Sequence, residues 1–174
     1  MALTGADRAV PTRGELYRSA ARVLELASRR GVTVGTAESC TGGLIAGELT
    51  EVPGSSAVVR GGVVSYAIPV KHEVLGVSQD VLDAPGIGAV SPECAEQMAR
   101  GARRVLGCDL AVSVTGIAGP GGEEPGKPVG TVWFGRSSDN GTESELHTFT
   151  GTRAEVRSKA VATALDLLAE AIQG

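Results

Sequence analysis

The sequence predicts a single α/β domain in which helices cover both faces of a central, mostly parallel sheet. Segments with apolar residues at helical spacing alternate with short β-branched runs along most of the chain, which is typical of this class. One run, residues 109–115, is apolar enough to be a strand in the middle of a sheet. The turn Asp139-Asn140-Gly141 is a strong hairpin signal, so the last two predicted strands form an antiparallel pair.

The composition excludes several classes of protein. The 174 residues are 42% hydrophobic and 21% charged, which suits one compact domain, and with 3% aromatic residues its core must be aliphatic. A net charge of −4 without a Lys/Arg run argues against a nucleic-acid partner, and no apolar stretch reaches membrane-spanning length. The three cysteines lack metal-ligand spacing, and the N-terminus lacks a signal pattern. We therefore expect reduced thiols, no bound metal, no membrane contact and a cytoplasmic location.

In the first half of the chain we expect a loose tail over residues 1–12, followed by one domain over residues 13–174. Apolar residues recur at helical spacing from Arg13, and Gly31 ends that helix. A strand is predicted further on, and the two glycines that interrupt its β-branched run, Gly61-Gly62, indicate a bulge or a close approach of the backbone. In order, the predicted elements are a helix over 13–30, a strand over 31–35, a turn over 36–43, a helix over 44–50, a strand over 58–66, and short helical segments over 68–75 and 78–84.

In the second half, Ser91-Pro92-Glu93 is typical of a helix start, with a capping serine, proline at the first position and an acid in the first turn. Strands on either side of the hairpin turn are expected, the second of them at the sheet edge. The predicted elements are a helix over 91–106, a strand over 109–115, a Gly-rich loop over 116–128, strands over 129–136 and 143–149, and an amphipathic helix over 152–172.

The turn Thr36–Gly43, sequence TAESCTGG, is the first candidate site. A strand ends and a helix begins there, which aims free backbone N–H groups and the positive end of the helix dipole at the space in front. Ser39, Cys40 and Thr41 place two hydroxyls and a thiol in that space, and Gly42-Gly43 leave the backbone accessible. This pattern is typical of acyl transfer by an activated nucleophile. The alternative is that Ser39 or Thr41 only caps the helix and the glycines only permit tight packing.

The carboxyl ends of parallel strands are where sites form in such sheets, and three more polar stretches are predicted there. They are residues 66–71, the Gly116 loop and the turn before the last helix. Lys71 is the best candidate for a base, because burial lowers a lysine pKa and leaves its amine neutral. Tyr66 would relay the proton or donate a hydrogen bond. The ordinary alternatives are a solvated lysine on a helix and a half-buried tyrosine at a strand end.

Other chemistries have less support. His72 and His147 have no aspartate in the register of a Ser–His–Asp triad, and no residues have the spacing of metal ligands. The Gly116 loop offers backbone N–H groups to an anion, and Arg153 and Lys127 are candidates for holding a phosphate.

Four blocks of this sequence resemble the C-terminal domain of the CinA competence-damage family. They are AESCTGGLIAGELTEVPGSS, GGVVSYAIPVKHEVLGV, AVSPECAEQMARGAR, and VSVTGIAGPGG followed by KPVGTVWFG. The resemblance covers nearly everything from Glu15 to the end. It implies a three-layer α/β/α sandwich with a mixed, mostly parallel five-stranded sheet. Longer members carry an N-terminal domain similar to molybdopterin-binding proteins, which we expect this chain to lack.

The resemblance also implies an activity and a site. Stand-alone members hydrolyse the carboxamide of nicotinamide mononucleotide (NMN) to nicotinic acid mononucleotide and ammonia, in pyridine-nucleotide salvage, without a metal or other cofactor. A homodimer is expected from the family. Carried over by motif, the serine nucleophile falls on Ser39, with Tyr66 and Lys71 as the other catalytic residues. The substrate-binding residues fall on Thr41, Gly42, Gly43, Thr115, Gly116, Gly119, Gly121 and Arg153.

Two departures from the family pattern bear on activity. Ala67-Ile68 replaces the usual Ser-Asn between the tyrosine and the lysine, and Thr152 replaces the aspartate of the usual Gly-Asp-Arg. Two other functions therefore stay open. One is a different amidase that uses Cys40, since a helix N-terminus also lowers a thiol pKa. The other is a nucleotide-binding or interaction domain without catalysis.

Overall fold

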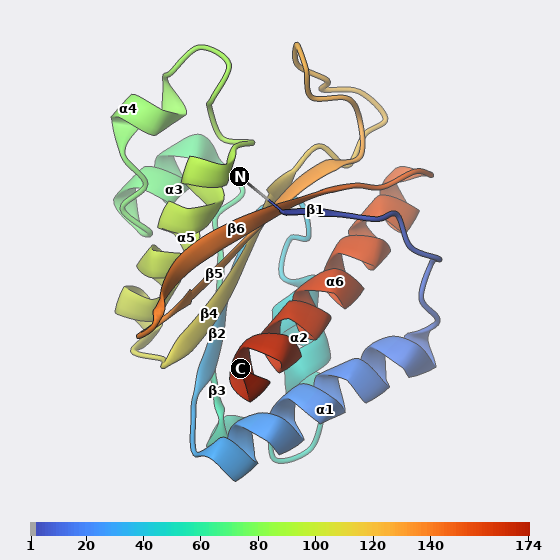
Figure 1. Ribbon diagram of the computed structural model, residues 1–174, viewed down its shortest axis with the longest axis vertical. Coiled ribbons are helices and arrows are strands. Elements are labelled where there is room, and N and C mark those ends of the chain that lie inside the picture. The colour runs from blue at the N-terminus through green and yellow to red at the C-terminus, as the bar shows by residue number, and fades with distance from the viewer. Residues whose placement is uncertain (1–2) are drawn as a thin grey trace.

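A mixed sheet forms the middle layer of the computed structural model, which describes residues 3–174 (Figure 1). Within these residues six strands pair in the order β1-β6-β5-β4-β2-β3. The pairs β1–β6, β2–β4 and β2–β3 are parallel, and β4–β5 and β5–β6 are antiparallel. This confirms the predicted α/β class with a mixed, mostly parallel sheet, and β1 adds a sixth strand to the five that we expected. The strands are β1 (Leu3–Gly5), β2 (Val34–Glu38), β3 (Val59–Val64), β4 (Leu110–Gly116), β5 (Thr131–Ser138) and β6 (Gly141–Thr148).

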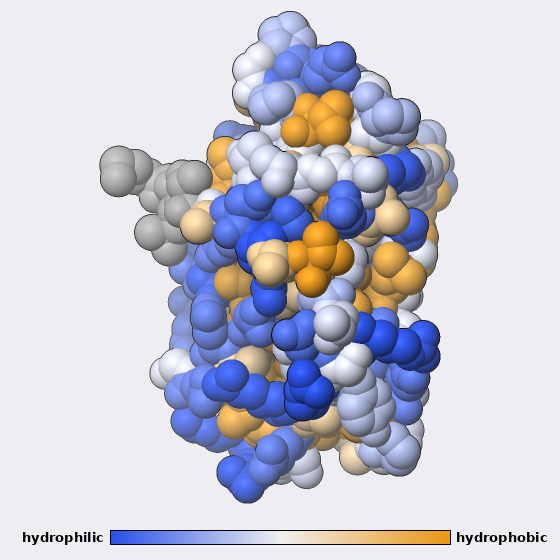
Figure 2. Space-filling view, turned by 90° about the vertical axis from the view of Figure 1, so that its right-hand side faces the viewer, coloured by the Kyte–Doolittle hydropathy of each residue, from blue (hydrophilic) through white to orange (hydrophobic). Residues whose placement is uncertain are grey.

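Helices cover both faces of the sheet, as predicted. The first hydrophobic cluster joins one face to α1, α2 and α6, and the second joins the other face to α5 and its neighbours. The helices are α1 (Arg13–Arg30), α2 (Leu44–Glu51), α3 (Ile68–Glu73), α4 (Gln79–Leu82), α5 (Pro92–Leu106) and α6 (Arg153–Gln173), with a 3-10 turn at Ser55–Ala57. On the molecular face seen in Figure 2, hydrophobic residues lie in separate small patches among hydrophilic ones.

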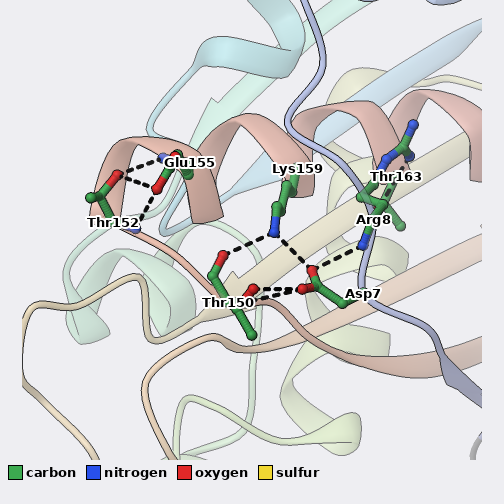
Figure 3. Close-up of polar contacts among 7 residues, drawn as sticks. All are labelled: Asp7, Arg8, Thr150, Thr152, Glu155, Lys159 and Thr163. Carbon is green, nitrogen blue, oxygen red and sulfur yellow. Dashed lines mark hydrogen bonds and ion pairs between the residues drawn. The ribbon is translucent and has the colours of Figure 1, made fainter.

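Local sequence signals set several helix ends where we expected them. The Ser91 hydroxyl accepts from the Cys94 amide and begins α5, and Gly31 ends α1 in the left-handed conformation. A capping box between Thr152 and Glu155 begins α6 (Figure 3). The start of α6 matters for the site, because it lies beside the loops at the carboxyl ends of β2 and β4.

Both features expected for Gly61-Gly62 occur: the register of β3 shifts just before Gly61, at Arg60, and Gly62 lies close to its neighbours. Val34 pairs with Val59 but Gly35 pairs with Gly61, so β3 has one extra residue at this point. A Cβ at Gly62 would lie 2.5 Å from the Thr36 hydroxyl and 2.8 Å from the Ala46 side chain. Glycine is therefore needed here for β3 to pack against β2 and α2.

The N-terminal segment corrects two expectations. Residues 3–5 form β1 and pair with β6, so the described part of residues 1–12 is not a loose tail and β6 is not an edge strand. Asp7 accepts hydrogen bonds from the Thr150 hydroxyl (2.7 Å) and from Lys159 on α6 (2.9 Å), as Figure 3 shows. Arg8 pairs with Asp166 further along α6. A three-residue strand is too short to show periodicity, which is why the sequence pattern missed it.

The strand before the candidate site also differs in its bounds. We predicted residues 31–35, but β2 runs from Val34 to Glu38 and is buried along its whole length. The three residues Thr36, Ala37 and Glu38 therefore belong to the strand and not to the turn. The sequence did not predict this extension of the strand, because these side chains are polar or small and a strand buried on both faces normally has an apolar sequence.

Candidate active site

The turn that follows β2 begins where three parallel strands end side by side. The Ser39 amide donates to the Val114 carbonyl of β4, and the Ser65 amide, just after β3, donates to the Glu38 carbonyl. Ser39 is thus held at the last rung of the sheet, and its side chain is 9% exposed. As predicted from topology, residues from several strand ends meet here.

Lys71 reaches Ser39 from α3. Its Nζ lies 2.9 Å from Ser39 Oγ, and the side chain is only 1% exposed. The Ser65 carbonyl lies 2.5 Å from Nζ and the Tyr66 carbonyl 3.4 Å from it. The lysine is therefore a buried group facing the candidate nucleophile, and not a solvated helix residue.

The surroundings of Lys71 favour its neutral form. Burial is the main cause that lowers the pKa of its amine below the ordinary value of 10.5. A neutral amine has two N–H donors and one lone pair. A neutral Lys71 would donate to the two carbonyl oxygens and present its lone pair to the Ser39 hydroxyl, whereas an ammonium would donate to all three oxygens. The geometry is that of a base and a nucleophile in direct contact.

Tyr66 lies at the site in a different way from the one we expected. Its side chain is 62% exposed, and the contact of its hydroxyl is with Arg153, 3.3 Å away. The residue meets Lys71 through its backbone carbonyl. Its phenol is therefore placed at the mouth of the site, beside the last helix, and not between the lysine and the serine.

The glycine turn is shaped by backbone conformations that need glycine. Gly42 and Gly43 have φ values of +63° and +94°, both in the left-handed region. Arg157 of α6 supports the same turn, since its guanidinium donates to the Cys40 carbonyl at 3.0 Å and to the Thr41 carbonyl at 2.9 Å. Thr41 is fully buried, and its hydroxyl has no partner among the described residues.

The expectation that this turn presents free backbone N–H groups needs correction at Gly42 and Gly43. The Gly42 amide donates to the Ser39 carbonyl at 3.1 Å, and the Gly43 amide donates to the Glu38 carboxylate at 2.9 Å. Both donors are thus already used. Within residues 3–174 the amides of Cys40 and Thr41 donate to no acceptor of another residue, so these two are the candidates of the turn for a developing negative charge.

The Gly116 loop and the start of α6 close another side of the site. Arg153 donates to the Gly119 carbonyl at 2.8 Å, which links α6 to this loop. The Thr115 hydroxyl donates to the Ala89 carbonyl at 2.6 Å, and a Cβ at Gly116 would lie 2.6 Å from the Thr131 carbonyl. The first of these contacts brings Gly119 next to Arg153. Gly121 is exposed, with open space around it, and no contact brings it to Ser39.

The environment of Cys40 does not suit a nucleophile. Its side chain is part of the first hydrophobic cluster, and burial raises the pKa of the thiol to about 12. A thiolate, which is the reactive form, is strongly disfavoured there. Cys94 and Cys108 are also free and buried.

The histidines lie outside this constellation. His72 Nδ1 is 2.8 Å from the Val77 carbonyl, and His147 packs between Phe134 and Phe149 beside Glu145. No group of three or more metal-ligating side chains occurs in the described part of the chain. Among residues 3–174, no helix combines the length and apolarity needed to cross a membrane.

Sequence reasoning missed two residues of the site, Glu38 and Arg157. Arg157 lies four residues after Arg153, which is one helical turn, so the two share a face of α6. That spacing was a usable signal. Glu38 is an acid shortly before a helix whose N-cap is a glycine, Gly43, and its position before a helix start without a capping side chain was a second signal.

The fold and the site together define a class of protein. It is an α/β/α sandwich in which a buried serine and lysine meet at the carboxyl edge of the parallel strands. The chain belongs to the CinA C-terminal domain family, whose model matches residues 16–172. This confirms the resemblance seen in the sequence blocks.

Relatives and solved structures agree with the family. A putative competence-damage inducible protein of Caldanaerobacter subterraneus subsp. tengcongensis is 44% identical over 152 residues, which cover 87% of this chain and 36% of that protein. A CinA-like protein of Leptospira borgpetersenii is 52% identical over 138 residues, 79% of this chain and 32% of that protein. The chain therefore spans about a third of the length of these relatives.

Among solved structures, the competence/damage inducible protein CihA from Agrobacterium tumefaciens matches with a TM-score of 0.87 and 42% identity, covering 96% of this chain and 99% of that one. A CinA superfamily protein from Klebsiella pneumoniae matches with a TM-score of 0.86 and 35% identity, covering 91% and 98%. The α/β/α fold of this chain is thus the fold of the family.

Proposed function

We propose that this protein is an amidohydrolase that converts NMN to nicotinic acid mononucleotide and ammonia. The observation that carries the proposal is the 2.9 Å contact between Ser39 Oγ and the buried Nζ of Lys71. Hydrolysis of an amide through a serine needs a base that is neutral at working pH, and a buried lysine meets this requirement. The choice of NMN rests on the family resemblance.

In the first step, Lys71 takes the Ser39 proton while Oγ attacks the carboxamide carbon. The negative charge that develops on the carboxamide oxygen is held by the free amides of Cys40 and Thr41. The new ammonium group of Lys71 then gives its proton to the departing nitrogen, and the C–N bond breaks to release ammonia. Water attacks the resulting acyl-serine while Lys71 takes a proton from it, and Lys71 gives that proton to Oγ as the C–Oγ bond breaks, which restores both Ser39 and the neutral amine.

Arg153 is the best placed group for the substrate phosphate. It is exposed at the N-terminal end of α6, and it already contacts Tyr66 and the Gly119 carbonyl at the mouth of the site. A guanidinium binds phosphate through several hydrogen bonds at once. The exposed phenol of Tyr66 lies beside it, where it can pack against the pyridine ring.

The amidase that uses Cys40 is the weaker alternative. A thiol whose pKa is raised to about 12 has almost no thiolate near neutral pH. The non-catalytic alternative predicts that NMN binds without turnover.

The test is ammonia release from NMN by the purified protein, with Ser39→Ala measured beside it. The proposal expects turnover by the wild type and none by the variant. NMN binding without ammonia release at any pH, by a protein that is folded, would instead identify a binding domain. Turnover retained by Ser39→Ala and lost on Cys40→Ala would identify the cysteine as nucleophile.

A further inference from the structure

Glu38 is a buried carboxylate beside the site that the proposed mechanism does not use. It is the last residue of β2, and it is 0% exposed. All of its contacts are with donors: the amides of Gly43 (2.9 Å), Ile45 (3.1 Å) and Ala46 (2.8 Å), and the Thr36 hydroxyl (3.2 Å). Each of these four groups can donate, so the Glu38 carboxylate oxygens accept a hydrogen bond from every one of them.

These contacts replace the missing cap of α2. The helix begins after Gly43, which has no side chain to cap it, and its first turn contains no acid. Three of the amides that a helix leaves without partners at its N-terminus are nevertheless satisfied, and Glu38 satisfies all three. The positive end of α2 is therefore occupied by a group of the protein itself.

The same contacts fix both ends of the turn that carries Ser39. On one side, the Glu38 backbone is held in the sheet by the Ser65 amide. On the other side, the Glu38 side chain holds the start of α2, so only residues 39–42 lie between the two anchored points. Ser39 is the first of these four residues, so a shift of α2 would pull on it through Cys40, Thr41 and Gly42, against the single hydrogen bond from its amide to the Val114 carbonyl.

We propose that Glu38 is a positioning residue that holds Ser39 in reach of Lys71. It does so by tying the first turn of α2 to the end of β2 through a buried carboxylate. This inference rests on the proposed role of Ser39 as the nucleophile, but it does not depend on NMN being the substrate. Glu38 itself touches neither Ser39 Oγ nor Lys71 Nζ in the described contacts, so it acts through the backbone.

The test uses Glu38→Gln, because glutamine keeps the size of the side chain but replaces one acceptor oxygen with an NH2 group that cannot accept. Glu15→Gln is the matched control. Glu15 is also a carboxylate that closes a helix N-terminus, accepting from the Thr12 amide and hydroxyl at 2.7 Å, but it belongs to α1. Both variants lose helix-capping bonds, and only one of the helices adjoins Ser39.

The readout is the rate at which a fluorophosphonate reagent labels Ser39, followed by mass spectrometry, together with kcat and KM for NMN. We expect Glu38→Gln to label Ser39 roughly ten- to a hundredfold more slowly, the penalty of a displaced reacting group, while Glu15→Gln labels at the wild-type rate. The loss in NMN hydrolysis should fall on kcat and not on KM. Circular dichroism and thermal melting establish that each variant is folded at the assay temperature.

The outcomes separate the inference from the proposed function. Labelling of wild-type Ser39 without ammonia release removes NMN as substrate and leaves the positioning role in place. Wild-type labelling rates in folded Glu38→Gln overturn the positioning role, whatever the substrate. If Glu38→Gln does not fold, Glu38→Asp decides, because aspartate keeps the charge but draws the carboxylate back from α2; an undiminished labelling rate in that folded variant also overturns it. No labelling of Ser39 in the wild type overturns both.

Discussion

Lys71 Nζ and Ser39 Oγ lie 2.9 Å apart although 32 residues separate them in the chain. The contact exists because β2 and β3 are parallel neighbours, so the segments that leave their carboxyl ends emerge side by side. The bulge at Gly61 shifts the register of β3 before that point. The site is thus a product of strand pairing, and the two side chains that matter belong to different segments after the sheet.

Replacing Lys71 should lower the catalytic rate without unfolding the protein. Lys71→Met keeps much of the side-chain volume but removes the base, so we expect kcat for NMN to fall by roughly 10²- to 10⁴-fold. The stability of the folded state should change little, because a buried amine no longer loses its hydration while the Ser65 and Tyr66 carbonyls lose a donor. The measurements are steady-state kinetics and urea denaturation. Arg29→Met, an exposed cation near the end of α1, is the control and should keep wild-type kcat; full activity in Lys71→Met would remove the lysine from the mechanism.

The pH dependence of activity should follow Lys71. Burial lowers the pKa of its amine below 10.5, and a base must be neutral, so kcat/KM should rise with pH through this lowered pKa and level off above it. In the window between the lowered pKa and 10.5 the unfolded chain binds more protons than the folded one, so the free energy of unfolding also rises with pH. Kinetics and urea denaturation across this range check both. An acid limb at or above pH 10.5 would contradict the assignment.

Arg153 can be tested with a substrate that lacks the phosphate. If its guanidinium binds the phosphate, Arg153→Ala should lower kcat/KM for NMN by roughly 10- to 100-fold, the value of a charge-assisted hydrogen bond. The loss should appear mainly in KM. Nicotinamide riboside, which has no phosphate, should be hydrolysed by the variant and the wild type at similar kcat/KM. Equal losses on both substrates would mean that Arg153 acts by holding the Gly119 loop.

Much of the fold follows from local patterns in this sequence. The caps at Ser91 and Thr152 and the glycine bulge in β3 were all predictable, because each depends on residues next to one another. The residues at which the strands begin and end were less predictable. β2 extends to Glu38 because three polar or small residues are buried between two neighbouring strands, which only the assembled sheet determines.

The site was predictable in its residues but not in its contacts. Motif order identified Ser39, Lys71 and Arg153, but a motif cannot say which atoms meet. The phenol of Tyr66 turns to Arg153, which is 87 residues away in the chain. The Gly43 amide donates to the Glu38 side chain, whose orientation a sequence motif does not specify. Arg157 was missed for the same reason, since its contacts with the serine turn span 116 and 117 residues.

The contact between the N-terminal segment and α6 should weaken in acid. Hydrogen bonds from Thr150 and Lys159 lower the pKa of Asp7 from 3.8 to about 2. A carboxylate with a lowered pKa stabilises the fold above its unfolded value, and that contribution is lost as the pH falls from about 4 to about 2. Asp7→Asn should therefore lower Tm near neutral pH, and the difference from the wild type should shrink towards pH 2. Thermal melts across this range check it, and a constant difference would contradict it.

The departure from the family pattern at Ala67 has a structural consequence, which a stabilising substitution can test. Ala67 is the N-cap of α3, the helix that carries Lys71, and it provides no side-chain cap. Since Pro69 has no N–H, the Val70 amide is the donor that a capping hydroxyl would take. The serine usual in the family at this position would supply that hydroxyl, so the departure removes a helix cap.

Ala67→Ser should therefore stabilise the protein by about 1 kcal/mol, the typical value of an N-cap, which corresponds to roughly 2–4 °C in Tm for a chain of this size. Ile68→Asn, the other half of the departure, is the matched control: residue 68 is exposed and lies inside the helix, so no such gain is expected. Thermal melts give the stabilities, and kcat for NMN is measured in parallel. A firmer start of α3 holds Lys71 more rigidly, so kcat should be maintained or raised. A loss of kcat in a stabilised Ala67→Ser would mean that the site requires the looser helix.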